Sequence, residues 1–214
     1  MYIPEHFRLH HPEEAVAFMR AHPFAILISS TADGPFATHL PLFVKEQEGK
    51  VLLHGHVAKA NPHWRYLEQQ PQCMTIFHGP HAYVSPSNYG ARESVPTWNY
   101  AAVHVYGNAR VFVSPEELHE VLDELMETFE PPYRQQWEGL SSKFQQNMLR
   151  QIVGFEIAAT RIEGKFKLSQ NRPREDQANV IASLDRSDDS AISGVARLMK
   201  EQHLGRISPE KDEE

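Results

Sequence analysis

A chain of 214 residues in which 41% are apolar and 23% are charged has the size and composition of a globular protein with a substantial core. Its formal net charge of −7 argues against nonspecific nucleic-acid binding, which depends on clustered Lys and Arg side chains. No run approaches the roughly 20 apolar residues of a membrane helix, and the start, MYIPEHFRLHHPEE, lacks the apolar segment of a signal peptide, so the sequence predicts a cytoplasmic protein.

Short apolar runs separated by turn residues dominate the first half of the chain, a pattern typical of an antiparallel barrel or sandwich. A short helix precedes them, because Pro12 suits a first helical position and acidic residues follow it. The expected strands are 24–31, 35–44, 51–57, 73–79, 81–86 and 97–113. Pro41 limits the second of these to an edge or a bulge. The single cysteine, Cys73, lies in the apolar run CMTIF and is expected to be a buried thiol, which excludes a disulfide framework.

The apolar spacing changes from strand to helix after residue 113. Ser114 and Glu117 stand at capping-box spacing around Pro115, so a helix should begin here and end before the Pro131-Pro132 pair. Residues 141–151 predict a shorter helix, 152–164 a strand that rejoins the sheet, and about 174–203 two further helices. The predicted architecture is a β-barrel with peripheral helices.

The stretch HGHVAKANPHWR, residues 54–65, gathers three histidines, a lysine and an arginine around an Asn-Pro pair. His54 and His56 are two apart on a strand and share a face, so together with His63 they have the residue types of a zinc or iron site. The lysine and arginine would raise the positive charge there, and the stretch contains no Asp, Glu or Cys. A metal site is therefore disfavoured.

An anion site accounts for more of this stretch. Asn61 is a preferred N-cap and Pro62 a preferred first helical residue, so a helix is expected to begin here with unpaired backbone N–H groups. Lys59 can supply a charge to a phosphate group, and His54 and His56 would face the same space from the strand end. The alternative is a well-capped helix whose cationic side chains are only solvated.

Two further stretches contain residues suited to a ligand. In VPTWNYAAVHVYG, residues 95–107, Trp98 and Asn99 lie near the strand start, where they could present an aromatic plane and an amide; the alternative is core packing. In KFKLSQNRPR, residues 165–174, Gln and Asn side chains in a basic loop could bind the carbonyl and N–H edge of a heterocycle; the alternative is a solvated loop.

These stretches closely resemble the PaiB-type FMN-binding negative transcriptional regulators. The resemblance spans about residues 1–205 and rests on MYIPEHF, ATHLPL, GHVAKANPHW, FHGPHAYVSPSNY, VPTWNYAAVHVYG, IVGFEI and KFKLSQNR, in that order. It implies an α+β, mainly β fold: an FMN-binding split β-barrel related to pyridoxamine phosphate oxidases and flavin reductases. The implied organisation is a split-barrel flavin-binding domain at 1–170, a C-terminal helical extension at 171–205, and a polar tail at 206–214. It also implies a homodimer with two FMN sites at the subunit interface.

The resemblance assigns FMN-binding roles to residues of both subunits. The residues implied along the isoalloxazine ring and ribityl chain are Thr38, His39 and Leu40. Those implied at the phosphate end are His54, His56, Lys59 and Asn61. From the partner subunit, those implied to face the ring are Trp98 and Asn99, and those implied to close the site are Lys167, Gln170 and Asn171. No catalytic residue and no metal ligand is predicted.

FMN binding and negative regulation of transcription are the functions that the resemblance implies. The sequence contains no helix-turn-helix with a basic recognition helix, and its net charge is acidic, so regulation would be indirect rather than by operator binding. The alternative is an FMN-dependent oxidoreductase or flavin reductase, although no acid, base or nucleophile stands out as catalytic. The histidine count alone keeps haem or metal handling open.

Overall fold

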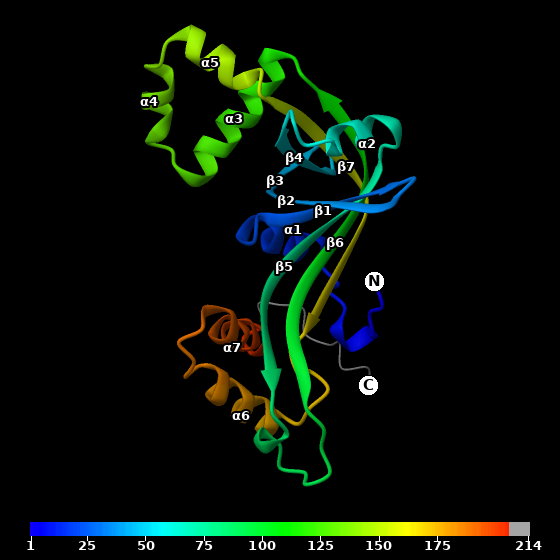
Figure 1. The fold of residues 1–214 in the computed structure, drawn as a ribbon. Coiled ribbons are helices and arrows are strands. Elements are labelled where there is room, and N and C mark those ends of the chain that lie inside the picture. Colours follow the sequence, from blue (N-terminus) through cyan, green and yellow to red (C-terminus); the bar gives the residue numbers. More distant parts are fainter. Residues whose placement is uncertain (206–214) are drawn as a thin grey trace. The chain divides into compact units, whose positions relative to one another are not determined.

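A sheet of seven strands, in the order β2-β1-β5-β6-β7-β4-β3, is the centre of the fold (Figure 1). The structure is a computed structural model that describes residues 1–205, so the predicted polar tail at 206–214 lies outside the described residues. The strands are β1 (Phe24–Thr31), β2 (Gly34–Pro41), β3 (Phe43–Gln47), β4 (Lys50–Ala58), β5 (Gln72–Val84), β6 (Thr97–Phe112) and β7 (Ile152–Lys167). The pairs β1–β2, β3–β4 and β4–β7 are antiparallel.

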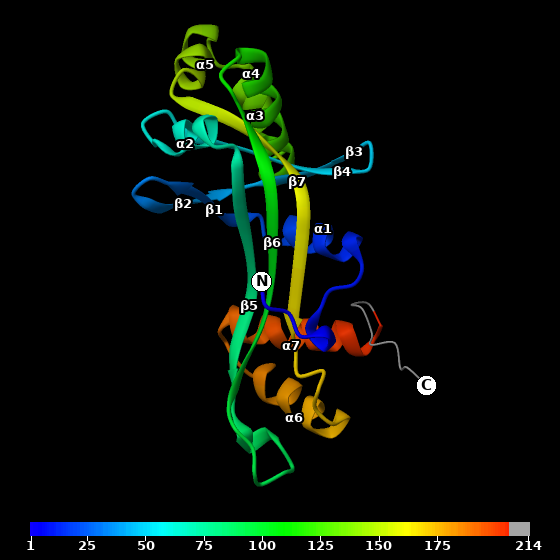
Figure 2. The same cartoon turned by 90° about the vertical axis from the view of Figure 1, so that its right-hand side faces the viewer.

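Two compact units share this sheet. Unit 1 contains Met1–His22, Phe77–His104 and the chain from Ile162 onward, and unit 2 contains Pro23–Ile76 and Val105–Arg161. The long strands β5, β6 and β7 contribute residues to both units (Figure 2).

The sheet of unit 2 closes on itself where β2 passes into β3. These strands follow one another in the chain, yet they lie at opposite ends of the strand order. Only Leu42 separates Pro41, at the end of β2, from Phe43, at the start of β3. Because consecutive Cα atoms are about 3.8 Å apart, the two ends of the sheet must meet here, which curls the sheet into a barrel. Leu42 is buried at this crossing, and its N–H donates to Pro23 O over 2.8 Å.

Helices flank the sheet in both units. Unit 2 has α2 (His63–Gln69) and the connected helices α3 (Pro115–Phe129), α4 (Tyr133–Glu138) and α5 (Ser142–Leu149), which lie together in Figure 1. Unit 1 has the 3-10 turns η1 (Glu5–Phe7) and η2 (Pro86–Asn88) and the helices α1 (Pro12–Ala21), α6 (Arg174–Leu184) and α7 (Ser190–His203). The predicted α+β, mainly β split-barrel fold with peripheral helices and a C-terminal helical extension is therefore confirmed.

The predicted start of α3 is confirmed in detail. The Oγ of Ser114 accepts the Glu117 N–H over 3.2 Å, and Pro115 occupies the first turn. Side chains of α3 then pack with those of β6, α5 and β7 in one apolar cluster, formed by Phe112, Leu118, Val121, Leu122, Leu149 and Ile152. This cluster holds the helices α3 and α5 against the barrel strands of unit 2.

Two strand predictions were wrong, and both involve proline. The segments expected as separate strands on either side of Pro80 form one strand, β5, because the fixed φ of proline is compatible with extended backbone. The single strand expected at 35–44 is divided into β2 and β3, which lie at the two edges of the sheet. Pro41 therefore ends an edge strand, as its missing N–H indicated.

Cys73 is the buried thiol that the sequence predicts. It lies on β5 in unit 2, and burial raises its pKa to about 12, so the thiol stays protonated and unreactive at physiological pH.

Candidate functional site

The backbone of Lys59, directly after β4, is fixed on both sides. Its N–H donates to Gln151 O over 2.7 Å, and its carbonyl accepts the Trp64 indole N–H over 3.1 Å. The side chain is exposed. The Lys59 ammonium group therefore projects from the surface of unit 2 at a point where two hydrogen bonds fix the backbone.

Asn61 joins this turn to α2 through its side chain. Its Oδ1 accepts the His63 N–H over 3.0 Å, and its own N–H donates to Ala58 O. Pro62 has helical angles, but α2 begins at His63, one residue later than predicted, and has seven residues. Because so short a helix has a small dipole, a ligand at this turn must depend mainly on side chains.

A buried histidine connects α2 to β1 and β2. His63 has no exposed surface; its Nδ1 lies 2.8 Å from Thr38 Oγ1 and its Nε2 lies 3.0 Å from Ser29 Oγ. Asn61 Nδ2 donates to the same Thr38 Oγ1 over 3.2 Å. Burial lowers the pKa of His63 to about 4, so the imidazole is neutral at physiological pH. Sequence reasoning missed Ser29 altogether and placed His63 only in a metal site, because no local signal relates residues of α2 and β1.

The three residues of β2 have different surroundings. Thr38 belongs to the network under α2, and Leu40 is buried in the core. His39, between them, points to the other side of the strand, is exposed, and lies with its ring centroid 6.3 Å from that of Phe24. Of this group, Thr38 is the residue that the structure brings together with Asn61.

His54 lies between two carboxylates. Its Nδ1 is 2.8 Å from Glu124 on α3, and its Nε2 is 3.0 Å from Glu156, its register partner on β7. The hydrogen bond to Glu124, followed by the charges and the bond to Glu156, raises the pKa of His54 against the opposing effect of burial. Both ring nitrogens thus face acidic groups, an environment that suits a cation and not a phosphate. His56, two residues on, is partly buried, which lowers its pKa.

Protonation of His54 should make part of the stability of unit 2 depend on pH. Because its pKa is raised above the ordinary value of 6.5, the folded protein holds a proton that the unfolded chain releases, so this stabilisation is complete below about pH 6.5 and is lost as pH rises through the raised value. Above about pH 6.5, where the histidines with lowered pKa values no longer titrate in either state, we expect the urea midpoint of the wild type to fall with rising pH, and His54→Gln to remove that fall.

The matched control for this measurement is His39→Gln, which removes an exposed histidine of the same unit. It should leave the pH dependence of the midpoint as it is in the wild type. Parallel pH curves for the wild type and His54→Gln would contradict the role assigned to the carboxylates of Glu124 and Glu156. Each of these carboxylates also contacts a second cation, Lys45 at Glu124 and Arg110 at Glu156.

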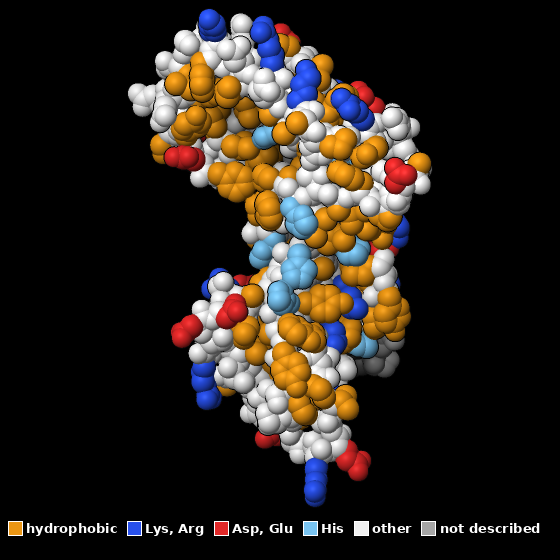
Figure 3. Space-filling view, viewed as in Figure 1, with side chains coloured by type: hydrophobic (Ala, Val, Ile, Leu, Met, Phe, Trp, Pro, Cys, Tyr) orange, Lys and Arg blue, Asp and Glu red, His pale blue; other side chains and the backbone are white. Residues whose placement is uncertain are grey.

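Unit 1 presents an aromatic strip on the strands β5 and β6, which we define as His78, His81, Tyr83 and Trp98. Trp98 is 53% exposed, and its ring centroid lies 5.7 Å from that of His81 and 6.3 Å from that of Tyr83. Figure 3 shows histidine and apolar side chains gathered on this face of the strands. The strip offers exposed aromatic surface bordered by imidazoles, with its rings inclined to one another by 41–75°.

Asn99 lies on the opposite side of β6 from Trp98, because adjacent strand residues point to opposite faces. It has no exposed surface, and its Nδ2 donates to Ser169 Oγ over 2.8 Å. Ser169 has a positive φ of 65°, and Gln170 folds back so that its amide accepts the Leu168 N–H and donates to Phe166 O. Asn99 and Gln170 thus build the turn that follows β7.

The remaining residues of this turn are more accessible. Asn171 is exposed, and Lys167 is partly exposed, with its Nζ bonded to Thr97 Oγ1. Burial, together with the charges of Lys165 and Arg172, lowers the pKa of Lys167. The turn therefore combines a rigid backbone with an accessible cation and an accessible amide.

Two features are absent from the described residues 1–205. No group of three or more His, Cys, Asp or Glu side chains there has the arrangement to hold a metal ion. Among the helices of these same residues, none has both the length and the apolarity needed to cross a bilayer.

The chain is similar to known proteins in sequence and in fold. Residues 1–161 match the family model described as "Putative FMN-binding domain". The "Protease synthase and sporulation protein PAI 2" of Bacillus subtilis is 38% identical over 205 residues, which cover 94% of this chain and 98% of that protein.

Two solved structures share the fold at low sequence identity. The FAD and heme binding protein from Mycobacterium smegmatis has a TM-score of 0.60 and 16% identity, with 82% of this chain and 79% of that chain covered. The flavocytochrome Anf3 from Azotobacter vinelandii has a TM-score of 0.58 and 18% identity, with 83% and 78% covered.

Proposed function

Because this chain belongs to the FMN-binding domain family of the PaiB type, we propose that it binds FMN with the phosphate at the Lys59–Asn61 turn of unit 2. FMN, the cofactor predicted from the sequence, is the one for which the family model is described. Bound FMN would supply a carrier of one or two electrons. The proposal concerns which of the chain's residues hold it.

The donor set of this turn fits a phosphate ester. Lys59 offers an exposed ammonium group on a backbone that is fixed by bonds to Gln151 and Trp64, and Arg65 is a second exposed cation close by in the chain. Next to them, the Thr38 hydroxyl and the Asn61 amide supply polar groups for the ribityl oxygens. The anchored Lys59 is the observation that carries the proposal. His54 is left out of this set, because both of its ring nitrogens contact carboxylates.

The ring end of the site belongs, in this proposal, to unit 1 of the second subunit of a homodimer. Trp98 supplies the exposed aromatic plane, and Lys167 and Asn171 supply a cation and an amide for the flavin edge. Asn99 and Gln170 act indirectly, by building the turn that holds Lys167 and Asn171 in place. This assignment is supported by the exposure of the residues proposed to touch the flavin and by the hydrogen bonds that Asn99 and Gln170 make within unit 1.

Flavin binding and assembly are tested together on the purified protein. We expect a visible flavin spectrum, or its appearance when FMN is added to the flavin-free protein, saturating at one FMN per chain, and a molecular mass in solution of two chains. A protein that takes up no FMN would overturn the proposed function. A monomer that binds FMN stoichiometrically would leave the cofactor assignment and overturn the shared site.

We further propose that any regulation of transcription by this protein is indirect. The cations of the predicted basic segment 165–174 are already engaged: Lys165 Nζ donates to Tyr2 O over 3.1 Å, the Arg172 guanidinium lies 4.2 Å from the centre of the Tyr89 ring, and Lys167, which bonds Thr97, is the cation proposed for the flavin edge. Tight operator binding needs several cations that are available to phosphates. The name of the Bacillus subtilis relative describes the role of that protein and is no observation on DNA binding by this chain.

We expect no sequence-specific DNA binding at about 150 mM salt, with or without FMN, because the phosphate contacts that resist this ionic strength are too few. A gel-shift series across salt concentrations with the protein's own upstream region measures this. A specific shift that persists at that salt concentration would restore direct repression. NADH and NADPH oxidation by the same FMN-loaded sample tests the alternative function, an FMN-dependent oxidoreductase.

A further inference from the structure

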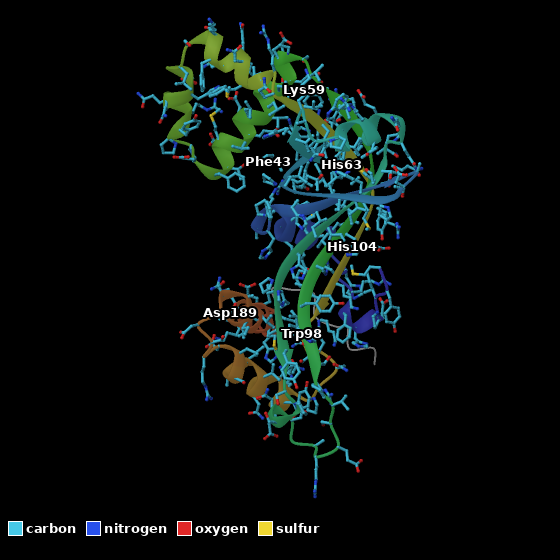
Figure 4. All side chains as sticks on the ribbon, viewed as in Figure 1. Phe43, Lys59, His63, Trp98, His104 and Asp189 are labelled. Atoms are coloured by element: carbon cyan, nitrogen blue, oxygen red, sulfur yellow. The ribbon has the colours of Figure 1, made fainter. Side chains whose placement is uncertain are left out.

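A chain of three polar side chains leads from the core of unit 2 to its surface under α2. Ser29 on β1 is 1% exposed and contacts His63 Nε2, and His63 Nδ1 contacts Thr38 Oγ1 on β2. In Figure 4, His63 lies beside the strands of unit 2. Thr38, at the outer end, is partly exposed. The hydrogen bonds of such a chain all donate in one direction or in the other, and the positions of the hydrogens decide which.

The Asn61 amide fixes the first hydrogen of this network. Its Oδ1 must face the His63 backbone N–H, which can only donate, over 3.0 Å. The NH₂ group of the same amide therefore faces Thr38 Oγ1, 3.2 Å away, and donates to it. One lone pair of the Thr38 hydroxyl is thus already occupied, whichever form His63 takes.

His63 is neutral at physiological pH, because burial lowers its pKa to about 4, so only one of its ring nitrogens carries a hydrogen. If that nitrogen is Nε2, it donates to Ser29 Oγ, and Thr38 donates to Nδ1. The Ser29 hydroxyl hydrogen then has no acceptor among the described residues and is shielded from water. Leaving a buried donor unpaired makes this form the minor one by about tenfold or more.

The other form gives every buried polar group of this network a partner. With the hydrogen on Nδ1, Ser29 donates to Nε2, and His63 donates to Thr38, which then accepts from both His63 and Asn61. The Thr38 hydroxyl hydrogen has no acceptor left inside this network, and Thr38 lies at the end that solvent reaches. Its hydrogen is therefore available to a group outside the protein.

We infer that Ser29 and His63 orient Thr38 as an obligatory hydrogen-bond donor at the flavin site, so that Thr38 selects an acceptor atom of the ligand, an oxygen or an unprotonated ring nitrogen. This inference rests on the proposed function, which places FMN next to Thr38. Within it, His63 is a positioning residue, since it acts through Thr38.

The ring form of His63 is measured directly by ¹⁵N NMR of the histidine-labelled protein, with His63→Gln used to assign the resonances. We expect a hydrogen on Nδ1 and none on Nε2, with or without FMN. A hydrogen on Nε2 would overturn the inference, even for a protein that binds FMN well. This measurement needs no ligand, so its failure is distinct from a failure of FMN binding.

The second measurement removes the inner end of the chain. Ser29→Ala deletes the partner of Nε2 and leaves that nitrogen unpaired in either ring form, so the preference of His63 for hydrogen on Nδ1 should weaken and Thr38 should donate outward in a smaller fraction of molecules. FMN affinity should then fall by about a few-fold, although Ser29 is buried and cannot touch a ligand. Thr38→Ser keeps the hydroxyl and should keep the affinity.

The matched control is Thr75→Val, which removes another fully buried hydroxyl of unit 2 that has no hydrogen-bond partner among the described residues. It should change neither the His63 resonances nor FMN affinity. If Ser29→Ala leaves both unchanged while the wild type binds FMN, the inference is wrong and the proposed function stands. If the wild type does not bind FMN, the proposed role of Thr38 toward the ligand falls with that function.

Discussion

FMN is expected to bind this protein about 100-fold or more tightly than riboflavin, because the phosphate adds charge-assisted hydrogen bonds of about 1.5–3 kcal/mol each. Lys59→Ala should remove much of that difference, lowering affinity for FMN and leaving affinity for riboflavin nearly unchanged. Quenching of flavin fluorescence during titration measures both affinities. The FMN affinity should also fall with rising salt, since the Lys59 side chain is exposed and its attraction is screened.

The control variant is Lys50→Ala. Lys50 is also exposed and is the first residue of β4, whereas Lys59 directly follows the last. The two substitutions change the net charge equally, so any difference between them reports the position of the charge and not its amount. Equal affinity of the wild type for FMN and riboflavin would exclude the Lys59–Asn61 turn as the phosphate site, whatever else the flavin contacts.

Local signals in the sequence predicted most of the helices and strands. The Ser114 cap and the apolar spacing after it define α3 because both act within a few residues along the chain. The strand boundaries at Pro41 and Pro80 were predicted wrongly, because they depend on how neighbouring strands pair. Nothing local indicates that β2 and β3 close the two edges of the sheet through one residue, Leu42, since that depends on pairing between segments far apart in the sequence.

The candidate site was predicted residue by residue, but the partners of these residues were not. The carboxylates that surround His54 come from α3 and β7, so the stretch around His54 contains no sign of them. By contrast, the alternation of side chains along a strand already places Trp98 and Asn99 on opposite faces. The structure accordingly exposes Trp98 and buries Asn99, whose contribution to the proposed site is to its framework.

The groups packed around each histidine decide what it does. His54 is held between carboxylates and has a raised pKa, whereas His63 is enclosed and has a lowered one. Both belong to the same short stretch, and composition treats them alike. Only the elements packed against them separate a histidine whose charged form is favoured and stabilises unit 2 from a neutral one that orders hydrogen bonds.

Phe155→Ala is expected to reduce the free energy of unfolding by about 3–5 kcal/mol, the range for removing a fully buried phenylalanine. The Phe155 side chain, on β7, has no exposed surface. It packs against β4 at Gly55, where an added Cβ would lie 3.0 Å from the Phe155 ring and 2.7 Å from the Leu42 side chain. Urea denaturation followed by circular dichroism gives the change in midpoint and in free energy.

Phe144→Ala is the control, because it deletes the same side chain at a position on α5 that is 47% exposed. Its effect should stay within about 1 kcal/mol. Gly55 lies between His54 and His56 on β4, and the residue that follows this strand is Lys59. A cavity at Phe155 therefore loosens the strand from which the proposed phosphate site is built. In Phe155→Ala, FMN affinity should fall together with stability, whereas Phe144→Ala should keep the FMN affinity of the wild type. A small stability loss in Phe155→Ala, equal to that of the control, would show that β4 and β7 are held together by their backbone pairing and not by this ring.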